Sequence, residues 1–155
     1  MCCEDVRQAF GASDKCCRDN MLMVKENGKK FTLQLPKNAT DTVCCIHVDD
    51  CLIQNKTQQK CDYWLRICQL NSHKNYFVEF KGGDIDHAFD QLVATIRQVR
   101  EKGVTLPKAS IHGVILGNNI PRLNAGTQKL KDKFTKTHGA DLQLHSKKEV
   151  VLVLK

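Results

Sequence analysis

A β-hairpin followed by an amphipathic helix is the pattern that most constrains the fold of this chain. Residues 61–67 and 75–80 are rich in β-branched and aromatic side chains, and the turn-forming stretch 71–74 separates them. Asp84 can then cap a helix over 85–99, in which apolar residues recur with a helical period. Two strands and a helix in this order predict a mixed α/β fold.

Further strands and helices are expected on both sides of this unit. At 155 residues and 17.6 kDa the chain has the length of one ordinary domain. We therefore expect a single α/β domain over residues 1–155, with a mixed central sheet flanked by helices and its core in the segment 43–116. Alternation of apolar residues predicts the remaining strands, at 31–35, 43–53, 110–116, 140–145 and 149–154. Helical spacing predicts one more helix, at 127–137.

The composition excludes several classes of protein. No apolar run approaches the ~18 residues that a membrane span requires. Residues 1–20 carry several charges and no apolar central stretch, so they do not read as a secretory signal. With 41% apolar and 26% charged residues, the chain is typical of globular proteins. We expect a cytoplasmic protein without membrane contact.

The positive charge is concentrated in the C-terminal part of the chain. Residues 97–155 hold 12 basic and 4 acidic residues, a balance of +8, whereas residues 1–96 hold 12 basic and 13 acidic, a balance of −1. Such a region attracts polyanions, because contacts to phosphates supply affinity that is independent of sequence. The alternative is a solvated lysine face that serves solubility. The candidate nucleic-acid-binding residues are the densest basic cluster, Lys129, Lys131, Lys133 and Lys136.

The nine cysteines are expected to be reduced. An odd number of cysteines and the lack of a signal peptide both argue against a disulfide framework. Within strands they would serve as small buried apolar residues, namely Cys44, Cys45, Cys51, Cys61 and Cys68. The alternative is a zinc site built from the two N-terminal cysteine pairs, which lack the usual C-x2–4-C spacing. Its ligands would be Cys2, Cys3, Cys16 and Cys17.

Two acids and a lysine in the hairpin form the candidate reactive site. Glu79 and Lys81 alternate with Phe80, so they share one face of their strand, and parity places Asp62 on the same face. Carboxylates there suit a hard divalent cation and a water that attacks a phosphodiester. A symmetric turn would set Asp62 opposite Gly83, roughly 13 Å from Glu79. We therefore expect an offset of the register by an even number of residues.

The segment 61–96, CDYWLRICQLNSHKNYFVEFKGGDIDHAFDQLVATI, resembles the PD-(D/E)XK nuclease superfamily, which has the restriction-endonuclease-like fold. By this resemblance Asp62 matches the first acid, and Glu79 and Lys81 match the Glu-x-Lys. The resemblance implies that Asp62 and Glu79 bind Mg²⁺ or Mn²⁺ and that Lys81 positions the attacking water. Gln91 matches a helix glutamine that supports the site in several branches of the superfamily.

The sequence departs from the family pattern at two points. Residue 61 is cysteine where the family has proline. An acid that often comes from an N-terminal helix has no clear counterpart, and Glu4 and Asp50 are the candidates for it.

The resemblance implies a metal-dependent endonuclease that hydrolyses DNA phosphodiester bonds, as a homodimer or as a subunit of a larger complex. One alternative is a catalytically silent nucleic-acid-binding or protein-assembly module that keeps the fold. A separate alternative for the acids and the lysine is that they form cross-strand charge pairs on an exposed sheet face.

Overall fold

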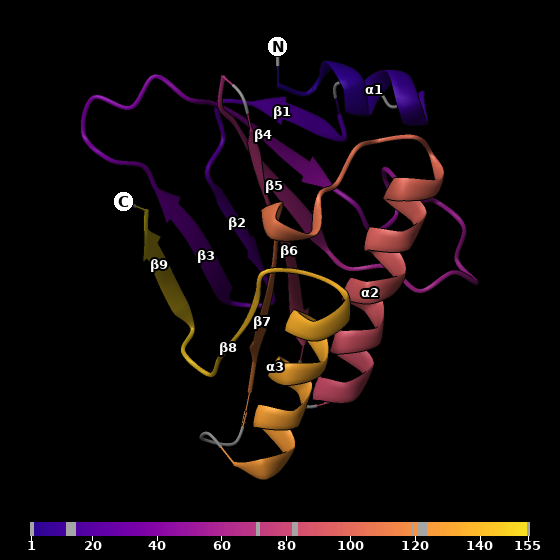
Figure 1. Cartoon of the computed structure of the whole chain (residues 1–155), viewed down its shortest axis with the longest axis vertical. Helices are drawn as coiled ribbons and strands as arrows, with labels where there is room; N and C mark the ends of the chain where they lie inside the picture. Colours follow the sequence, from indigo (N-terminus) through magenta and orange to yellow (C-terminus); the bar gives the residue numbers. More distant parts are fainter. Residues whose placement is uncertain are drawn as a thin grey trace.

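The computed structural model describes residues 2–11, 15–70, 72–81, 84–118, 120 and 124–154, with Lys81 described by its backbone alone. Within these ranges three α-helices and two mixed β-sheets build one α/β domain (Figure 1). None of the helices formed by these residues is long and apolar enough to span a membrane.

The larger sheet has the strand order β1-β4-β5-β6-β7-β8, and the smaller sheet has the order β2-β3-β9. Strands β4, β5 and β6 are antiparallel neighbours, whereas β6, β7 and β8 run parallel to one another. The elements in chain order are α1 (Glu4–Phe10), β1 (Cys17–Asp19), β2 (Met23–Glu26), β3 (Lys29–Gln34), β4 (Thr42–His47), β5 (Tyr63–Cys68), β6 (His73–Lys81), α2 (Ile85–Glu101), a 3-10 turn (Lys108–Ser110), β7 (Ile111–Gly117), α3 (Ala125–Thr137), β8 (Asp141–His145) and β9 (Glu149–Val153).

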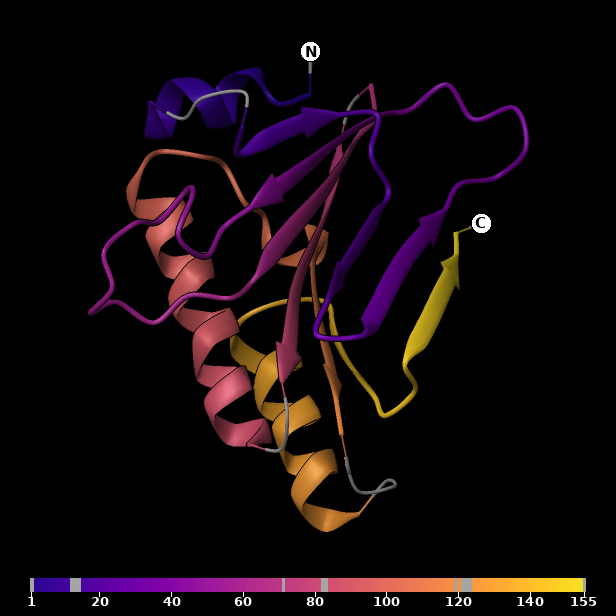
Figure 2. The same cartoon turned by 180° about the vertical axis from the view of Figure 1, so that it is seen from behind.

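Helices α2 and α3 are the crossovers that parallel pairing requires, since each joins two parallel neighbours of the larger sheet. Both lie side by side on one face of that sheet, and the smaller sheet covers the other face (Figures 1 and 2). Asp84 caps α2 by accepting a 3.0 Å hydrogen bond from the His87 N–H. Asn124 and Thr127 cap α3 reciprocally. Both helices begin at the edge of the sheet where β6 and β7 end.

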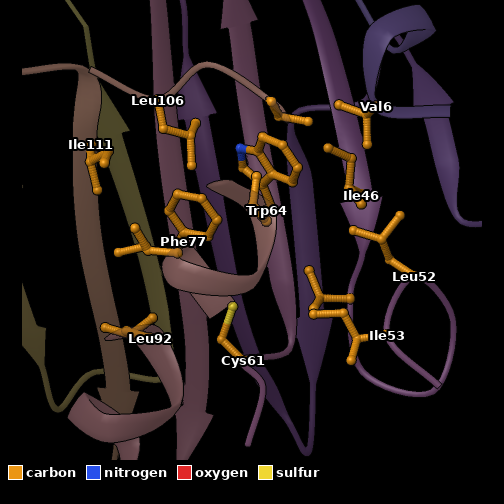
Figure 3. Close-up of a cluster of buried hydrophobic side chains, with 14 of the residues drawn as sticks. Val6, Ile46, Leu52, Ile53, Cys61, Trp64, Phe77, Leu92, Leu106 and Ile111 are labelled. Carbon is orange, nitrogen blue, oxygen red and sulfur yellow. The ribbon is translucent and has the colours of Figure 1, made fainter. Parts of the chain in front are cut away.

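Alternating residues of the central strands build two separate cores. On the helix face Trp64 of β5 stacks on Phe77 of β6 at 5.3 Å (Figure 3). The Trp64 Nε1–H donates to Asn75 Oδ1 at 3.0 Å. On the other face Leu65 belongs to a cluster that includes Phe31 of the smaller sheet. Both faces of β5 and β6 are therefore buried, which explains their nearly continuous apolar sequences.

Six of the nine cysteines form disulfides, so the expectation of reduced thiols is wrong for them. Cys2–Cys68, Cys3–Cys44 and Cys16–Cys51 have Cα separations of 5.7, 5.3 and 5.5 Å. All three bonds tie the N-terminal segment to β4, to β5 or to the loop after β4. They also rule out the zinc site, because Cys2, Cys3 and Cys16 have no thiolate to offer. Disulfides persist in oxidising compartments, which argues against the expected cytoplasmic environment.

An ion pair between a buried arginine and a largely exposed aspartate also holds α1 against β5. Arg66 of β5 is 2% exposed, and its Nη1 lies 2.6 Å from Asp5 Oδ2 of α1. The guanidinium also lies over the Trp64 ring, 5.6 Å from its centroid. Loss of Asp5 would leave the buried Arg66 charge without its carboxylate, so Arg66 depends on the docking of α1.

The sequence predicted the central unit well and its surroundings less well. The hairpin of β5 and β6 and the helix α2 confirm the expected pattern, and α3 and β7 lie close to their expected ranges. Strand β4 ends at His47 instead of residue 53, because the chain turns there. The Leu52 N–H donates to the His47 carbonyl, and Asp50 adopts a left-handed conformation with φ of 59°.

Thiol counting tests the disulfide pairing. Denatured, non-reduced protein should show three titratable thiols, from Cys17, Cys45 and Cys61, and nine after reduction. Reduction should also lower the urea midpoint of unfolding, because each bond that closes a loop of this length restricts the unfolded chain by about 4 kcal/mol in the chain-entropy model. Cys45→Ser is the control: it should remove one thiol and preserve the effect of reduction. Nine reactive thiols before reduction would contradict the pairing.

Candidate functional site

The register of the β5–β6 hairpin brings Asp62 beside Glu79. Tyr63 pairs with Val78, and Cys68 pairs with His73, so the loop between the strands is short. Asp62, the residue before β5, therefore lies opposite Glu79 instead of Gly83. This shift of four residues confirms the even-numbered offset expected from the sequence.

Asp62 and Glu79 lie on the helix face of the sheet and are both buried. They continue the row begun by the Trp64–Phe77 pair, since side chains alternate along each strand. Asp62 is 8% exposed and Glu79 is 2% exposed. The expectation that the two acids share a face is thus confirmed, and the alternative of a solvent-exposed salt-bridged face does not fit this burial.

Burial and nearby acids raise the pKa of Asp62 to about 7. Desolvation is the largest cause, and the charges of Glu26 and Asp49 raise the pKa further. Two hydrogen bonds act in the opposite direction, one from the Phe80 N–H to Asp62 Oδ2 at 2.8 Å and one with the Glu79 side chain. Asp62 therefore keeps its proton to a higher pH than an exposed aspartate does. A cation in that place would replace the proton.

The two carboxylates of Asp62 and Glu79 are ligands of the type that Mg²⁺ prefers, but they are few. Carboxylate oxygens are the ligands that Mg²⁺ prefers, and this ion often takes one or two carboxylates and completes its shell with water and substrate phosphate. Among the residues described, no group of three histidine, cysteine, aspartate or glutamate side chains is placed to hold a metal. The role of metal ligands expected for Asp62 and Glu79 therefore stays a prediction.

Lys81 is the last residue of β6, and its backbone pairs with Gly117 of β7. Its side chain, like Gly82 and Gly83, lies outside the described part of the chain. The role expected for Lys81 therefore stays a prediction.

Gln91 contacts the segment that leads into Asp62, not the two acids themselves. Its Nε2 donates to the Lys60 carbonyl at 3.1 Å. One turn later Thr95 Oγ1 accepts a 2.7 Å hydrogen bond from the Cys61 N–H. Proline has no N–H to donate, so the cysteine at position 61 makes a contact with α2 that the family's proline does not make. Gln91 and Thr95 thus fix the backbone just before Asp62.

Glu26, which the sequence analysis did not single out, belongs to the surroundings of Asp62. It ends β2, and its charge is close enough to raise the pKa of Asp62. Its Oε2 is buried and has no hydrogen-bond partner among the described residues. Glu4, one of the acids considered from the sequence, lies in α1, which the disulfide of Cys68 ties to the opposite end of β5.

The basic cluster lies on α3, beside α2 on the helix face of the sheet (Figure 1). Three of its four lysines are exposed, and Lys131 is half-buried. Lys133 Nζ lies 5.4 Å from the centroid of the Phe89 ring of α2. Because both helices begin at the carboxyl edge of β6 and β7, their positive dipole ends lie at the same edge as Glu79.

No protein-family model, curated protein or solved structure matches the chain.

The pH dependence of stability tests the burial of Asp62. Its pKa of about 7 lies above the value of about 3.9 in an unfolded chain, so the folded state holds an extra proton between these values. Stability from this group is therefore present below pH 4 and is lost as the pH rises toward 7. Asp62→Asn, which keeps an acceptor for the Phe80 N–H, should be more stable than wild type at pH 8 by about 1–3 kcal/mol.

Urea unfolding of both proteins at pH 4 to 8 measures this difference, and Asp90→Asn on the exposed side of α2 is the matched control. The control should follow the wild-type profile. Parallel profiles for wild type and Asp62→Asn would show that Asp62 ionises normally.

Proposed function

We propose that this protein is a metal-dependent nuclease that hydrolyses DNA phosphodiester bonds and has a restriction-endonuclease-like core. The observation that carries the proposal is the buried Asp62–Glu79 pair at the start of β5 and the end of β6. The acids lie at the carboxyl edge of the parallel strands β6 and β7, where α/β sheets usually bind ligands.

The proposed roles follow from the placement of each group. Asp62 and Glu79 hold Mg²⁺ or Mn²⁺, and the ion supplies charge neutralisation on the phosphate and a water of lowered pKa. Lys81, at the end of the same strand, positions the attacking water. Gln91 acts from α2 through the Lys60 carbonyl, and so keeps Asp62 in line with Glu79.

The substrate side of the proposal rests on charge. The α3 cluster, Lys129, Lys131, Lys133 and Lys136, supplies phosphate contacts that hold the DNA backbone along the helix layer. Cleavage of both strands would use two such sites, in a homodimer or in a larger complex. The three disulfides favour an oxidising compartment as the place of this activity.

Plasmid cleavage tests the proposal. Wild-type protein with Mg²⁺ or Mn²⁺ should nick or linearise plasmid DNA, and EDTA should stop the reaction. Asp62→Asn, Glu79→Gln and Lys81→Ala should each lower the rate by about 100-fold or more, because each removes a group that acts on the reacting atoms. Asp90→Asn should cleave like wild type. Equal cleavage by all variants would remove these residues from the mechanism.

Metal binding gives a second measurement that does not depend on turnover. Mg²⁺ or Mn²⁺ should raise the melting temperature of wild type at pH 8 and much less at pH 5, where Asp62 keeps its proton. Glu79→Gln should lose this stabilisation. DNA binding without metal binding or cleavage would favour the alternative, a silent module that keeps the fold.

A further inference from the structure

A pocket of about 440 Å³ lies between the loop 54–61 and the first half of α2. Its wall includes Lys56 and Lys60 from the loop, His87 and Gln91 from α2, and Asp49 from the turn after β4. Most of these side chains carry N–H donors. The pocket is therefore a polar recess that the proposed roles of Asp62 and Glu79 do not use.

The pocket adjoins the acid pair. Lys60 precedes Asp62 by two residues, which keeps their Cα atoms within about 7 Å of each other. The Lys60 carbonyl accepts the hydrogen bond from Gln91, and Asp49 is close enough to act on Asp62 through its charge. A ligand in this recess would thus lie next to whatever is bound at Asp62 and Glu79.

The Lys60 ammonium is buried with weak compensation. The residue is 7% exposed, although lysine is almost never fully buried unless it is paired. Its Nζ donates to the Asn55 carbonyl at 2.6 Å, and its nearest carboxylate oxygen is Asp49 Oδ1 at 3.9 Å. An ammonium has three donors and Asn55 takes one of them, so within the described ranges two donors of Lys60 are left for other acceptors.

An anion in the recess would supply acceptors for the free donors of Lys60, whose ammonium is only loosely paired with Asp49. Besides Lys60, the wall offers the ammonium of Lys56, the His87 ring and the amide of Gln58, and it also carries the carboxylates of Asp49 and Asp50. These donors come from two elements that hydrogen bonds hold together, since Gln98 of α2 donates to the Gln59 carbonyl at 2.8 Å. The recess is therefore preorganised.

We infer that this pocket binds one phosphate group of the DNA strand adjacent to the phosphate that is cut, with Lys60 as its buried anchor. The inference rests on the proposed nuclease function. It assigns the pocket a task that differs from that of the α3 lysines: those hold the duplex from an exposed surface, whereas Lys60 fixes the position of one strand relative to Asp62. Its rival is a purely structural Lys60 that only fastens the loop through Asn55 and Asp49.

Binding of a fluorescein-labelled, 12-nucleotide single-stranded DNA in EDTA tests the inference without cleavage. Lys60→Met keeps the length of the side chain and removes the charge. It should weaken binding about tenfold at low salt. It should also reduce the slope of log affinity against log salt by about 0.7, the value for one contact to a single-strand phosphate. Lys37→Met, which removes the same charge from an exposed loop, should change the affinity less than twofold.

The salt slope separates the two readings of Lys60. A structural lysine would lower the melting temperature on substitution and leave the slope of the folded protein unchanged, and that result would overturn the inference. Equal affinities of Lys60→Met and Lys37→Met would overturn it as well.

Wild-type protein provides a measurement that does not depend on how well the variant folds. Inorganic phosphate, titrated in EDTA, should shift the backbone amide signals of Lys60, His87 and Gln91 and compete with the oligonucleotide. Shifts confined to α3, or none, would overturn the inference. Loss of plasmid cleavage in wild type would contradict the nuclease proposal alone, because this titration and the binding assay use neither metal nor turnover.

Discussion

The alignment of β5 against β6 is the constraint on which the rest of the site depends. In the observed register Asp62 lies opposite Glu79. A shift of β5 along β6 would place the two carboxyl groups at different positions along the strands. The Trp64–Phe77 stack helps to set this alignment, because a slip by one residue would move both rings to the opposite face. Helix α2 then fixes the backbone before Asp62 through Gln91 and Thr95. The position of the acid pair thus depends on the packing of the core and on the hydrogen bonds from α2.

Residue pattern alone predicted what depends on local spacing. The hairpin, α2 with its Asp84 cap and the shared face of Asp62 and Glu79 all follow from periods of 2 and 3.6. The features that the pattern did not predict depend on contacts between residues that are distant in the sequence. Glu26 reaches Asp62 only because the smaller sheet packs across the larger one, and the Asn27-Gly28 turn that forms its hairpin gives no sign of that destination. The pocket around Lys60 likewise depends on contacts between a loop and a helix.

The cysteines show why an argument from number and spacing led to a wrong conclusion. Adjacent side chains do point apart, and Cys44 faces the helix layer while Cys45 faces the smaller sheet. In the N-terminal segment, however, divergence lets Cys2 and Cys3 reach two different strands, at Cys68 and Cys44. The number of cysteines and the lack of a readable signal peptide do not show whether a pair of adjacent cysteines forms two disulfides or none. The geometry of a doublet is compatible with two separate cross-links as well as with none.

The parallel pairing of β3 with β9 has a consequence for the order in which the protein can assemble. Strands β2 and β3 form a hairpin near the beginning of the chain, and an isolated hairpin is at best marginally stable in water. Its third strand, β9, is separated from β3 by more than a hundred residues. One edge of β3 therefore stays unpaired until residues 149–153 have been synthesised, and an unpaired strand edge is prone to aggregation during folding.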